Sequence, residues 1–405
     1  MIKAVFLDLD DTLIQTNRAQ FFSSYLETLG DYASRTTPPN EFVTKTMTSY
    51  SIALNNGDPI HTLEEKFLPV MAAAIQQDPS EVALLYRTYY AECYAALAPM
   101  VRANPLTREV LDWLVSHEYP VVVATNPGLP AAAITQRMEW GEIPAADESF
   151  ALITTLENMH FGKPNPEYYE EIMAHLALAP GEAIMVGDDW ENDIVGAAMV
   201  GLHTFWINNN SQSIPDPDLP ISAIGSYQSF VGLLKHGWLE TLGATKVTDN
   251  ALTHRLAAFP ASLDALRRAY RPELLECHPA AGEWSARHIV CHLRDHEAAE
   301  DRMRLERIVN EDKPFLSTIY DPWAHAHNYD ETSTEVALYD FARSRSDTVS
   351  WLNRLPAEAW QRTARHSIFG PTTFSEMVRF TTEHDLTHLR QIRKAIESAI
   401  IMCGN

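Results

Sequence analysis

Residues 4–13 read Ala-Val-Phe-Leu-Asp-Leu-Asp-Asp-Thr-Leu, an apolar run that leads directly into acidic residues. An apolar run of this length, closed by polar residues, predicts a buried strand of a parallel sheet. Asp8 and Asp10 then lie at the carboxyl end of that strand, where open α/β sheets bind their ligands. Two carboxylates two residues apart suit a nucleophile and a general acid/base beside a cation. A simple capped strand end has the same pattern, so the interpretation depends on residues further along the chain.

The length and composition of the chain indicate a protein of two or three domains. It has 405 residues, of which 46% are hydrophobic, so it can bury a core. It contains no run of ~20 apolar residues, and Asp8 and Asp10 interrupt the apolar N-terminus, so we expect no membrane span and no signal peptide. The cysteines form no Cys-x-x-Cys and no disulfide framework, which favours a reducing, cytoplasmic location. They are Cys93, Cys277, Cys291 and Cys403.

Charge is distributed unevenly along the chain, whose net charge is −23. Residues 1–236 hold 30 acidic and 11 basic side chains, whereas residues 237–405 hold 24 and 20. Ten of the 16 histidines lie in the second part. We expect no nucleic-acid binding from so acidic a chain, because contacts with phosphate backbones require lysine and arginine. The two parts are expected to carry different chemistry.

The residues that follow the first strand predict a helical insertion. Residues 16–98 carry apolar side chains at helical spacing. An insertion of about 80 residues is too long for a plain loop. The four expected helices span residues 19–29, 41–55, 62–76 and 79–97.

Further apolar runs in the first part also end in polar residues. Residues 119–124 lead into Thr125 and Asn126, and a short strand at 150–154 precedes Gly-Lys163-Pro-Asn-Pro. Residues 183–187 lead into an acidic turn, and residues 201–207 form a fifth strand. One ammonium, on Lys163, would offset clustered carboxylates and an incoming phosphate. The acidic turn, facing Asp8, would make an oxygen-rich site suited to Mg²⁺. Its carboxylates are Asp188, Asp189 and Asp193, and the sequence does not decide whether Asp188 or Asp189 lies closer to the metal.

These stretches resemble the four ordered motifs of haloacid dehalogenase-like (HAD) hydrolases, over about residues 1–236. The resemblance implies a Rossmann-like core at 1–15 and 99–236, with a helical cap at 16–98. It also implies an Mg²⁺-dependent phosphatase or phosphomutase acting on a small phosphorylated metabolite. Dehalogenases proper lack the second aspartate of the first motif, and an alkoxide leaving group needs an acid whereas halide does not. Asp10 therefore favours phosphoryl chemistry.

The HAD resemblance also assigns roles to individual residues. Asp8 is the nucleophile that forms an aspartyl-phosphate, and Asp10 is the general acid/base. Thr125, Asn126 and Lys163 hold the phosphoryl group. The Mg²⁺ residues are Asp8, Asp10 through a backbone carbonyl near it, Asp188 and Asp193.

From about residue 240 the chain changes character, and no strand-like runs remain. After a linker at 237–247, residues 248–405 predict a four-helix bundle. The complete fold class is therefore α/β plus all-α. The expected amphipathic helices span residues 248–269, 284–310, 331–354 and 373–400.

Histidines recur at helical spacing in the second and fourth of these helices. His288, His292 and His296 share one face, and His384 and His388 lie one turn apart, where two imidazoles can bind one metal. With Trp-Ser at 284–285 and Gln-Ile at 391–392, the pattern resembles the DinB-like metal-binding bundle family over about residues 245–400.

The DinB-like resemblance implies that His292, His384 and His388 bind Zn²⁺ or Ni²⁺, with His288 or His296 in reserve. It also implies thiol-dependent transfer or metal-dependent hydrolysis, with a low-molecular-weight thiol as a partner. Three alternatives stay open. The bundle is the main activity, or it is a non-catalytic regulatory or homodimerisation module, or its histidines lie on plain solvated helices.

Overall fold

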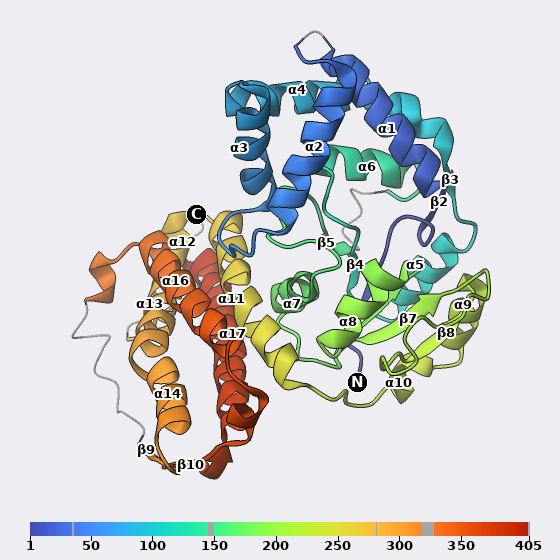
Figure 1. Ribbon diagram of the computed structural model, residues 1–405. Coiled ribbons are helices and arrows are strands. Elements are labelled where there is room, and N and C mark those ends of the chain that lie inside the picture. Colours follow the sequence, from blue (N-terminus) through green and yellow to red (C-terminus); the bar gives the residue numbers. More distant parts are fainter. Residues whose placement is uncertain (35, 145–149, 281, 318–327, 404–405) are drawn as a thin grey trace. The chain divides into compact units, whose positions relative to one another are not determined.

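The structure is a computed structural model that describes residues 1–34, 36–144, 150–280, 282–317 and 328–403. The chain divides into two compact units (Figure 1). The first comprises Met1–Tyr169 and Leu178–Lys246, and the second comprises Glu170–Ala177 and Val247–Asn405. Within the described residues, no helix is both long and apolar enough to cross a membrane.

A six-stranded parallel sheet forms the centre of the first unit, with the order β5-β4-β1-β6-β7-β8. The predicted α/β class is confirmed, and the five expected strands are present. The sixth, β8, was not expected, because three residues carry no readable alternation. The strands are β1 (Ala4–Leu7), β4 (Val121–Val123), β5 (Phe150–Ile153), β6 (Ala183–Gly187), β7 (His203–Ile207) and β8 (Ala223–Gly225).

Strand β1 lies at the centre of this sheet and fixes where the polar residues gather. Val5 pairs with Val121 of β4 on one side and with Ile184 of β6 on the other. All four residues of β1 are buried, as its apolar sequence predicts. Because β4, β1 and β6 run parallel and in register, the residues that follow them meet at one edge of the sheet.

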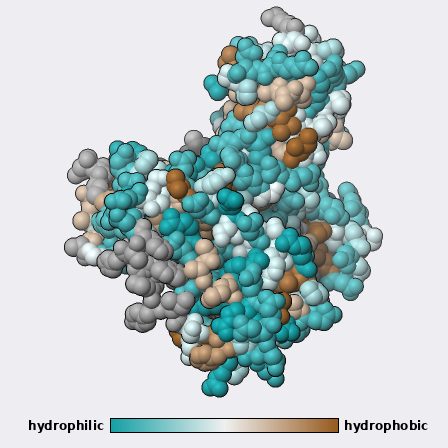
Figure 2. All heavy atoms as spheres, turned by 60° about the vertical axis from the view of Figure 1, so that its left-hand side comes forward, coloured by the Kyte–Doolittle hydropathy of each residue, from teal (hydrophilic) through white to brown (hydrophobic). Residues whose placement is uncertain are grey.

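Helices cover both faces of this sheet and form the insertion after β1. The insertion consists of α1 (Arg18–Ala33), α2 (Pro39–Leu54), α3 (Leu63–Ile75) and α4 (Pro79–Glu92). Apolar side chains gather on part of its surface, among mostly hydrophilic surroundings (Figure 2). The other helices of the first unit are α5 (Thr107–Ser116), α6 (Ala131–Trp140), α8 (Gly196–Met199), α9 (Tyr227–Lys235) and α10 (Trp238–Thr241). Helix α7 (Pro166–His175) begins in the first unit, but its residues from Glu170 onward belong to the second.

A two-stranded antiparallel ribbon joins the insertion to the sheet. It consists of β2 (Ile14–Thr16) and β3 (Val101–Ala103), and Ile14 pairs with Ala103. The ribbon was not expected from the sequence, because each strand has only three residues. It holds the two chain crossings between insertion and core side by side, so the insertion is attached through one narrow connection.

The second unit is a helical bundle, as predicted. Its helices are α11 (Asp249–Ala269), α12 (Pro272–Glu276), α13 (Ala286–His296), α14 (Arg302–Asn310), α16 (Thr334–Leu352) and α17 (Phe374–Cys403). The single helix expected over 284–310 is interrupted by a π-helical turn at Glu297–Asp301. The interruption could not be predicted, because these five residues are all polar or small and carry no apolar repeat that would mark it.

Two expectations about the second unit are wrong. Strands do occur there, as the three-stranded sheet β11-β10-β9, formed by β9 (Phe315–Leu316), β10 (Thr363–His366) and β11 (Gly370–Thr373). These strands have two to four residues, too few for a period-two pattern to stand out. Cys93 and Cys291 are free, but Cys277 is disulfide-bonded, because separation along the sequence does not prevent pairing in space.

Candidate functional site

The carboxylate of Asp8 and the ammonium of Lys163 form the centre of the first candidate site. Lys163 Nζ lies 2.7 Å from Asp8 Oδ1 and 2.6 Å from Asp193 Oδ1. All three side chains are almost fully buried. Burial lowers the pKa of Lys163, but the negative charges of Asp193 and Asp8 outweigh that effect and the pKa is raised overall. The lysine is therefore a fixed cation beside Asp8.

The turn after β6 brings a third carboxylate to this edge. Oxygens of Asp8, Asp188 and Asp193 all lie within 4.8 Å of one another. Gly187 permits this approach, because a Cβ there would lie 2.2 Å from Asp193 Oδ2. Asp189 Oδ1 accepts from Asn192 N at 3.0 Å, and Asp189 belongs to none of the metal-type groups among the described residues. Of the two neighbouring carboxylates, Asp188 is thus the one that joins Asp8.

Arg18, at the start of α1, reaches the same edge. Its Nη2 lies 2.7 Å from Asp188 Oδ1 and 3.2 Å from the backbone carbonyl of Asp10, while its Nη1 contacts Asp189 Oδ2 at 2.8 Å. Burial raises the pKa of Asp188 to about 7, although Arg18 opposes the shift. One guanidinium nitrogen therefore lies between the two oxygens that were expected to bind a cation.

The side chain of Asp10 is not part of the carboxylate group. It forms an ion pair with Arg137 of α6, whose guanidinium also lies 4.6 Å from the ring of Phe21. Burial lowers the pKa of Arg137 to about 10, although the charge of Asp8 opposes the shift. The expectation that Asp10 contributes to a metal site is left with its carbonyl alone, and Arg137 orients its carboxylate.

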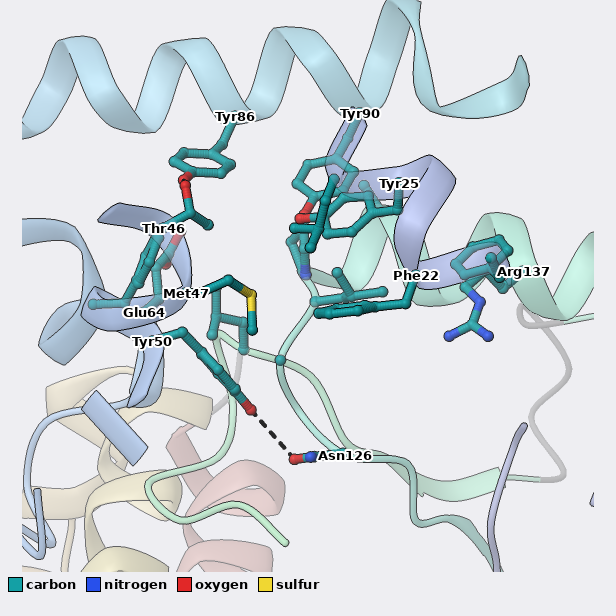
Figure 3. Close-up of a pocket in the computed structure, with 18 of the residues that line it drawn as sticks. Phe22, Tyr25, Thr46, Met47, Tyr50, Glu64, Tyr86, Tyr90, Asn126 and Arg137 are labelled. Carbon is teal, nitrogen blue, oxygen red and sulfur yellow. Dashed lines mark hydrogen bonds between the residues drawn. The ribbon is translucent and has the colours of Figure 1, made fainter. Parts of the chain in front are cut away.

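The residues after β4 form another wall of the site. Thr125 is buried, and its carbonyl accepts from Thr154 Oγ1 at 2.7 Å and from Tyr168 Oη at 2.8 Å. Asn126 Oδ1 accepts from Tyr50 Oη at 3.3 Å, a contact between the insertion and the core (Figure 3). Thr125 and Asn126 therefore follow the strand next to β1, at the sheet edge that Asp8 also occupies.

The donor set of this site fits Mg²⁺. Asp8, Asp188 and the carbonyl of Asp10 offer hard oxygen ligands, the type that Mg²⁺ requires. Asp193 is held by Lys163 and by the backbone N–H of Asp189, at 2.9 Å from Asp193 Oδ2. Asp193 can therefore hold the neighbouring carboxylates in position without itself being a strong metal ligand.

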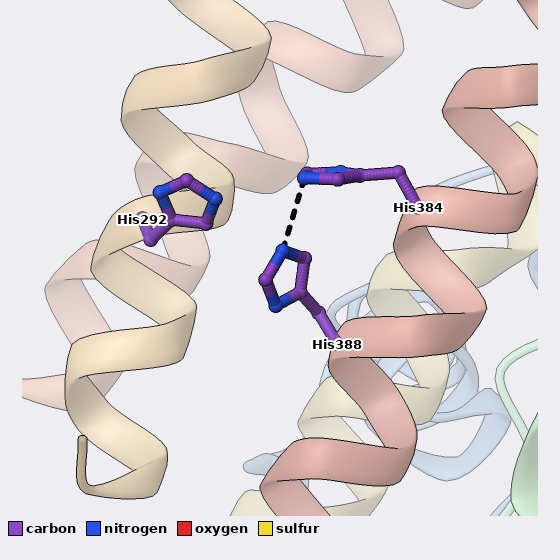
Figure 4. A group of neighbouring side chains, drawn as sticks. All are labelled: His292, His384 and His388. Atoms are coloured by element: carbon purple, nitrogen blue, oxygen red, sulfur yellow. Dashed lines mark hydrogen bonds between the residues drawn. The ribbon is translucent and has the colours of Figure 1, made fainter. Parts of the chain in front are cut away.

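The second candidate site lies in the bundle, where three histidines from two helices meet (Figure 4). Nitrogens of His292, His384 and His388 all lie within 4.8 Å of one another. His384 Nε2 and His388 Nε2 are 2.9 Å apart. Helix α13 supplies His292 and α17 supplies the pair, so the structure brings together the three residues expected from the sequence.

The electrostatics of this group favour neutral imidazoles. Burial lowers the pKa of His384 to about 2 and that of His388 to about 4, and neighbouring histidines add to both shifts. His388 Nδ1 lies 2.7 Å from Gln391 Oε1, which favours a proton on Nδ1 and leaves Nε2 free for a metal. His384 Nδ1 is buried with no hydrogen-bond partner in the described part of the chain. Neutral nitrogen ligands of this kind fit Zn²⁺ or Ni²⁺.

The two reserve histidines have different surroundings. His296 Nδ1 lies 3.0 Å from Asp301 Oδ2, and its ring stacks on that of His384 with centroids 4.4 Å apart. His288 Nδ1 lies 2.8 Å from Ser285 Oγ, and His288 belongs to a separate group with His278 and Asp330. His296 is therefore next to the metal-type cluster, whereas His288 is not.

Sequence reasoning missed several residues that shape these sites. Arg18 and Arg137 reach the carboxylates from α1 and α6, and no motif marked them. Arg345 of α16 contacts Glu297 and Asp385, which directly follow two of the histidines in sequence. The scarcity of basic residues in the first part was the one available signal, since any buried cation there has many carboxylates to meet.

The sequence matches two family models, one for each part of the chain. Residues 2–201 match haloacid dehalogenase-like hydrolase, and residues 252–392 match the DinB superfamily. The chain is 28% identical over 204 residues to the pyrophosphatase PpaX of Bacillus cereus (strain AH820), which covers 50% of this chain and 82% of that protein.

Two solved structures resemble the two parts. The HAD phosphatase from Thermococcus onnurineus has a TM-score of 0.39 and 20% identity, covering 57% of this chain and 98% of its own. YfiT from Bacillus subtilis, described as having an unusual four-helix bundle topology, has a TM-score of 0.34 and 18% identity, covering 40% of this chain and 91% of its own.

Proposed function

The chain is a haloacid dehalogenase-like hydrolase joined to a DinB superfamily domain, and we propose that its first unit is an Mg²⁺-dependent phosphatase of a small phosphorylated compound. The carrying observation is the buried contact of Lys163 Nζ with both Asp8 and Asp193, beside Asp188. A nucleophilic carboxylate next to a fixed cation suits attack on a phosphoryl group.

In the proposed reaction, Asp8 attacks phosphorus, an aspartyl-phosphate bond forms and the ester P–O bond breaks. Asp10 gives a proton to the departing alkoxide, and later takes one from the water that attacks the aspartyl-phosphate. That second attack releases phosphate and restores Asp8. Lys163 and the groups after β4, Thr125 and Asn126, hold the phosphoryl oxygens.

The remaining groups support these steps. Arg137 keeps the carboxylate of Asp10 in place through their ion pair. Mg²⁺, bound by Asp8, Asp188 and the Asp10 carbonyl, would supply charge neutralisation for the developing negative oxygens. Asp193 would hold these ligands in position through its hydrogen bonds with Lys163 and Asp189.

Hydrolysis of p-nitrophenyl phosphate by the whole protein with Mg²⁺ tests this proposal. Asp8→Asn should abolish turnover and leave the fold intact, because the shape is kept and the nucleophile is lost. Asp112→Asn is the matched control, since Asp112 is an exposed carboxylate of α5 and takes no part in the group around Asp8. Near-normal turnover by Asp8→Asn would contradict the mechanism, as would loss of turnover in both variants.

For the bundle, we propose a single transition-metal site formed by His292, His384 and His388. The neutral histidine cluster and the bond from His388 to Gln391 support this site. Metal content of the whole protein after reconstitution with Zn²⁺ or Ni²⁺ is the measurement, for the wild type and for the double variant His384→Ala/His388→Ala. His236→Ala, in the other unit, is the control. Full occupancy in the double variant would contradict the assignment.

Two candidate functions of the bundle remain to be distinguished. A thiol-dependent transferase or hydrolase is favoured by three imidazole ligands that leave positions open for a substrate. A regulatory module would instead change phosphatase turnover when the metal is removed. Phosphatase rates of the metal-loaded wild type and of the double histidine variant separate them, because equal rates exclude regulation through the metal.

A further inference from the structure

A cavity of about 700 Å³ lies between the inserted helices and the core of the first unit. Asp10, Arg18, Asn126 and Arg137 line it, so it opens onto the groups that surround the proposed phosphoryl site. Asn126 and Arg137 are labelled in Figure 3. The rest of the wall comes mainly from α1, α2, α3 and α4. A cavity of this size is within the range that encloses a whole small-molecule ligand.

Aromatic rings form much of the wall contributed by the insertion. Phe22, Tyr25, Tyr86 and Tyr90 come from two different helices (Figure 3). The tyrosine hydroxyls are already engaged, because Tyr25 Oη lies 2.7 Å from Tyr90 Oη and Tyr86 Oη lies 2.8 Å from Thr46 Oγ1. These side chains therefore offer mainly ring surfaces to a ligand, because each of these hydroxyls already has one protein partner.

Three charged residues lie in the wall away from the phosphoryl site. Glu157 accepts from the backbone N–H of Ala131 at 2.9 Å and so caps α6. Glu64 lies in the first turn of α3, where a carboxylate complements the helix end. Arg87 is the third charged residue away from the phosphoryl site. Apart from these charged groups, the wall contributed by the insertion is mainly aromatic and aliphatic, which favours an apolar alcohol over a sugar.

We propose that this cavity binds the leaving-group alcohol, and that the substrate is a phosphomonoester of a bulky apolar alcohol, aliphatic or aromatic. The inference rests on the proposed phosphatase function and specifies its substrate class. The phosphate remains with Asp8 and Lys163, the ester oxygen lies near Asp10, and the apolar part extends among the rings. Pyrophosphate has no apolar part that could fill this space.

The test is a homologous series of ethyl, butyl, hexyl and octyl phosphate with the whole protein and Mg²⁺. Burial of one CH₂ is worth ~0.8 kcal/mol, so kcat/KM should rise about fourfold per added methylene until the cavity is filled. Octyl and 1-naphthyl phosphate should exceed glycerol phosphate, glucose 6-phosphate and pyrophosphate. A flat series, or preference for the polar compounds, would overturn the proposal.

Two further arms separate this inference from the phosphatase function. Hydrolysis of p-nitrophenyl phosphate without any effect of chain length would reject the apolar substrate class alone. Absence of hydrolysis of every ester would reject the phosphatase function. In that case the binding of ethyl- and octylphosphonate, measured by calorimetry, still tests the apolar cavity. The proposal requires octylphosphonate to bind more tightly than ethylphosphonate.

Substitutions in the wall place the effect in the cavity. Phe22 is 44% exposed and Met47 is 37% exposed, so Phe22→Gln and Met47→Gln are compatible with folding. Each should lower kcat/KM for octyl phosphate several-fold more than for ethyl phosphate. The matched control is Leu84→Gln, at a residue of α4 that is 58% exposed and not part of the wall. Equal losses on both esters, or the same change in the Leu84 variant, would contradict the assignment.

Discussion

Arg345 makes buried contacts with two carboxylates of the bundle. Its side chain is 1% exposed, and its Nε lies 2.8 Å from Glu297 Oε2. Its Nη1 and Nη2 lie 2.5 and 3.1 Å from the two carboxylate oxygens of Asp385. Glu297 directly follows His296, and Asp385 directly follows His384. One guanidinium therefore connects the two chain segments that carry the histidine cluster.

Arg345→Met should destabilise the bundle by ~3 kcal/mol at pH 7. Removing one partner of a buried ion pair typically costs about 3–5 kcal/mol, because the other charge stays buried. The lower end applies here, for two reasons. Burial already raises the pKa of Asp385 to about 6 against the effect of Arg345, so this acid can take up a proton. Glu297 also keeps its bond from Thr348 Oγ1 at 2.6 Å.

Scanning calorimetry of the whole protein measures the effect, with the bundle and the first unit followed as separate transitions. The midpoint of the bundle should fall by roughly 6–12 °C, at about 2–4 °C per kcal/mol for a domain of this size. Arg343→Met is the matched control, because Arg343 lies on the same helix and is exposed. It should change the midpoint by less than about 2 °C, as surface substitutions do.

The pH dependence provides an internal check on this reasoning. At pH 5 an acid with a pKa of about 6 is largely protonated in the wild type too, so its attraction to Arg345 is already lost. The difference between wild type and Arg345→Met should therefore narrow from pH 7 to pH 5. A loss at pH 7 equal to that of Arg343→Met, or a difference that widens at pH 5, would refute the argument.

Three other outcomes follow from the described contacts. Arg18→Gln should tighten Mg²⁺ binding up to about fivefold in calorimetry, since a half-exposed competing cation is worth ~1 kcal/mol or less, whereas Arg108→Gln should leave it unchanged. Asp10→Ala should slow alkyl phosphates more than aryl phosphates in steady-state assays, because an alkoxide needs the proton more than a phenolate does; equal losses would contradict its role. The free energy of unfolding of the metal-free bundle, measured with denaturant, should fall by about 2 kcal/mol for each of His384 and His388 between pH 7 and pH 5. Their folded pKa values, about 2 and about 4, lie below the unfolded value of about 6.5, so between pH 7 and pH 5 the unfolded chain binds protons at these imidazoles and the folded chain does not. A free energy of unfolding that stays constant over this range would contradict the assigned burial.

The sheet and its polar edge were predictable because they depend on local pattern and on one general rule. Each long apolar run formed a strand, and parallel strands place the residues that follow them at one edge. Asp8, Thr125 and Asp188 could therefore be placed together from their positions in the sequence alone. Lys163 lies in a loop and does not directly follow a strand, so its position at this edge was predicted from the family resemblance.

The contacts made by arginines were not predictable in the same way. Arg18 and Arg137 extend from helices, and which carboxylate each one meets depends on how those helices pack on the sheet. Arg345 lies on a helix whose apolar spacing was clear, but its partner Glu297 lies in a π-helical turn that no repeat marked. Hydrophobic periodicity locates elements, whereas the direction of a long charged side chain is set by tertiary packing.

Each of the two units contains a buried cation between two carboxylates, but the two cations have different consequences. Lys163 contacts Asp8, the proposed nucleophile, so its charge acts on the atoms that would react. Arg345 contacts Glu297 and Asp385, which lie next to histidines in sequence and belong to none of the metal-type groups among the described residues. Loss of Lys163 should therefore appear first as lost turnover, and loss of Arg345 as lost stability followed by weaker metal binding. We therefore propose that the same electrostatic arrangement acts on the reaction in one unit and on the position of the histidines in the other.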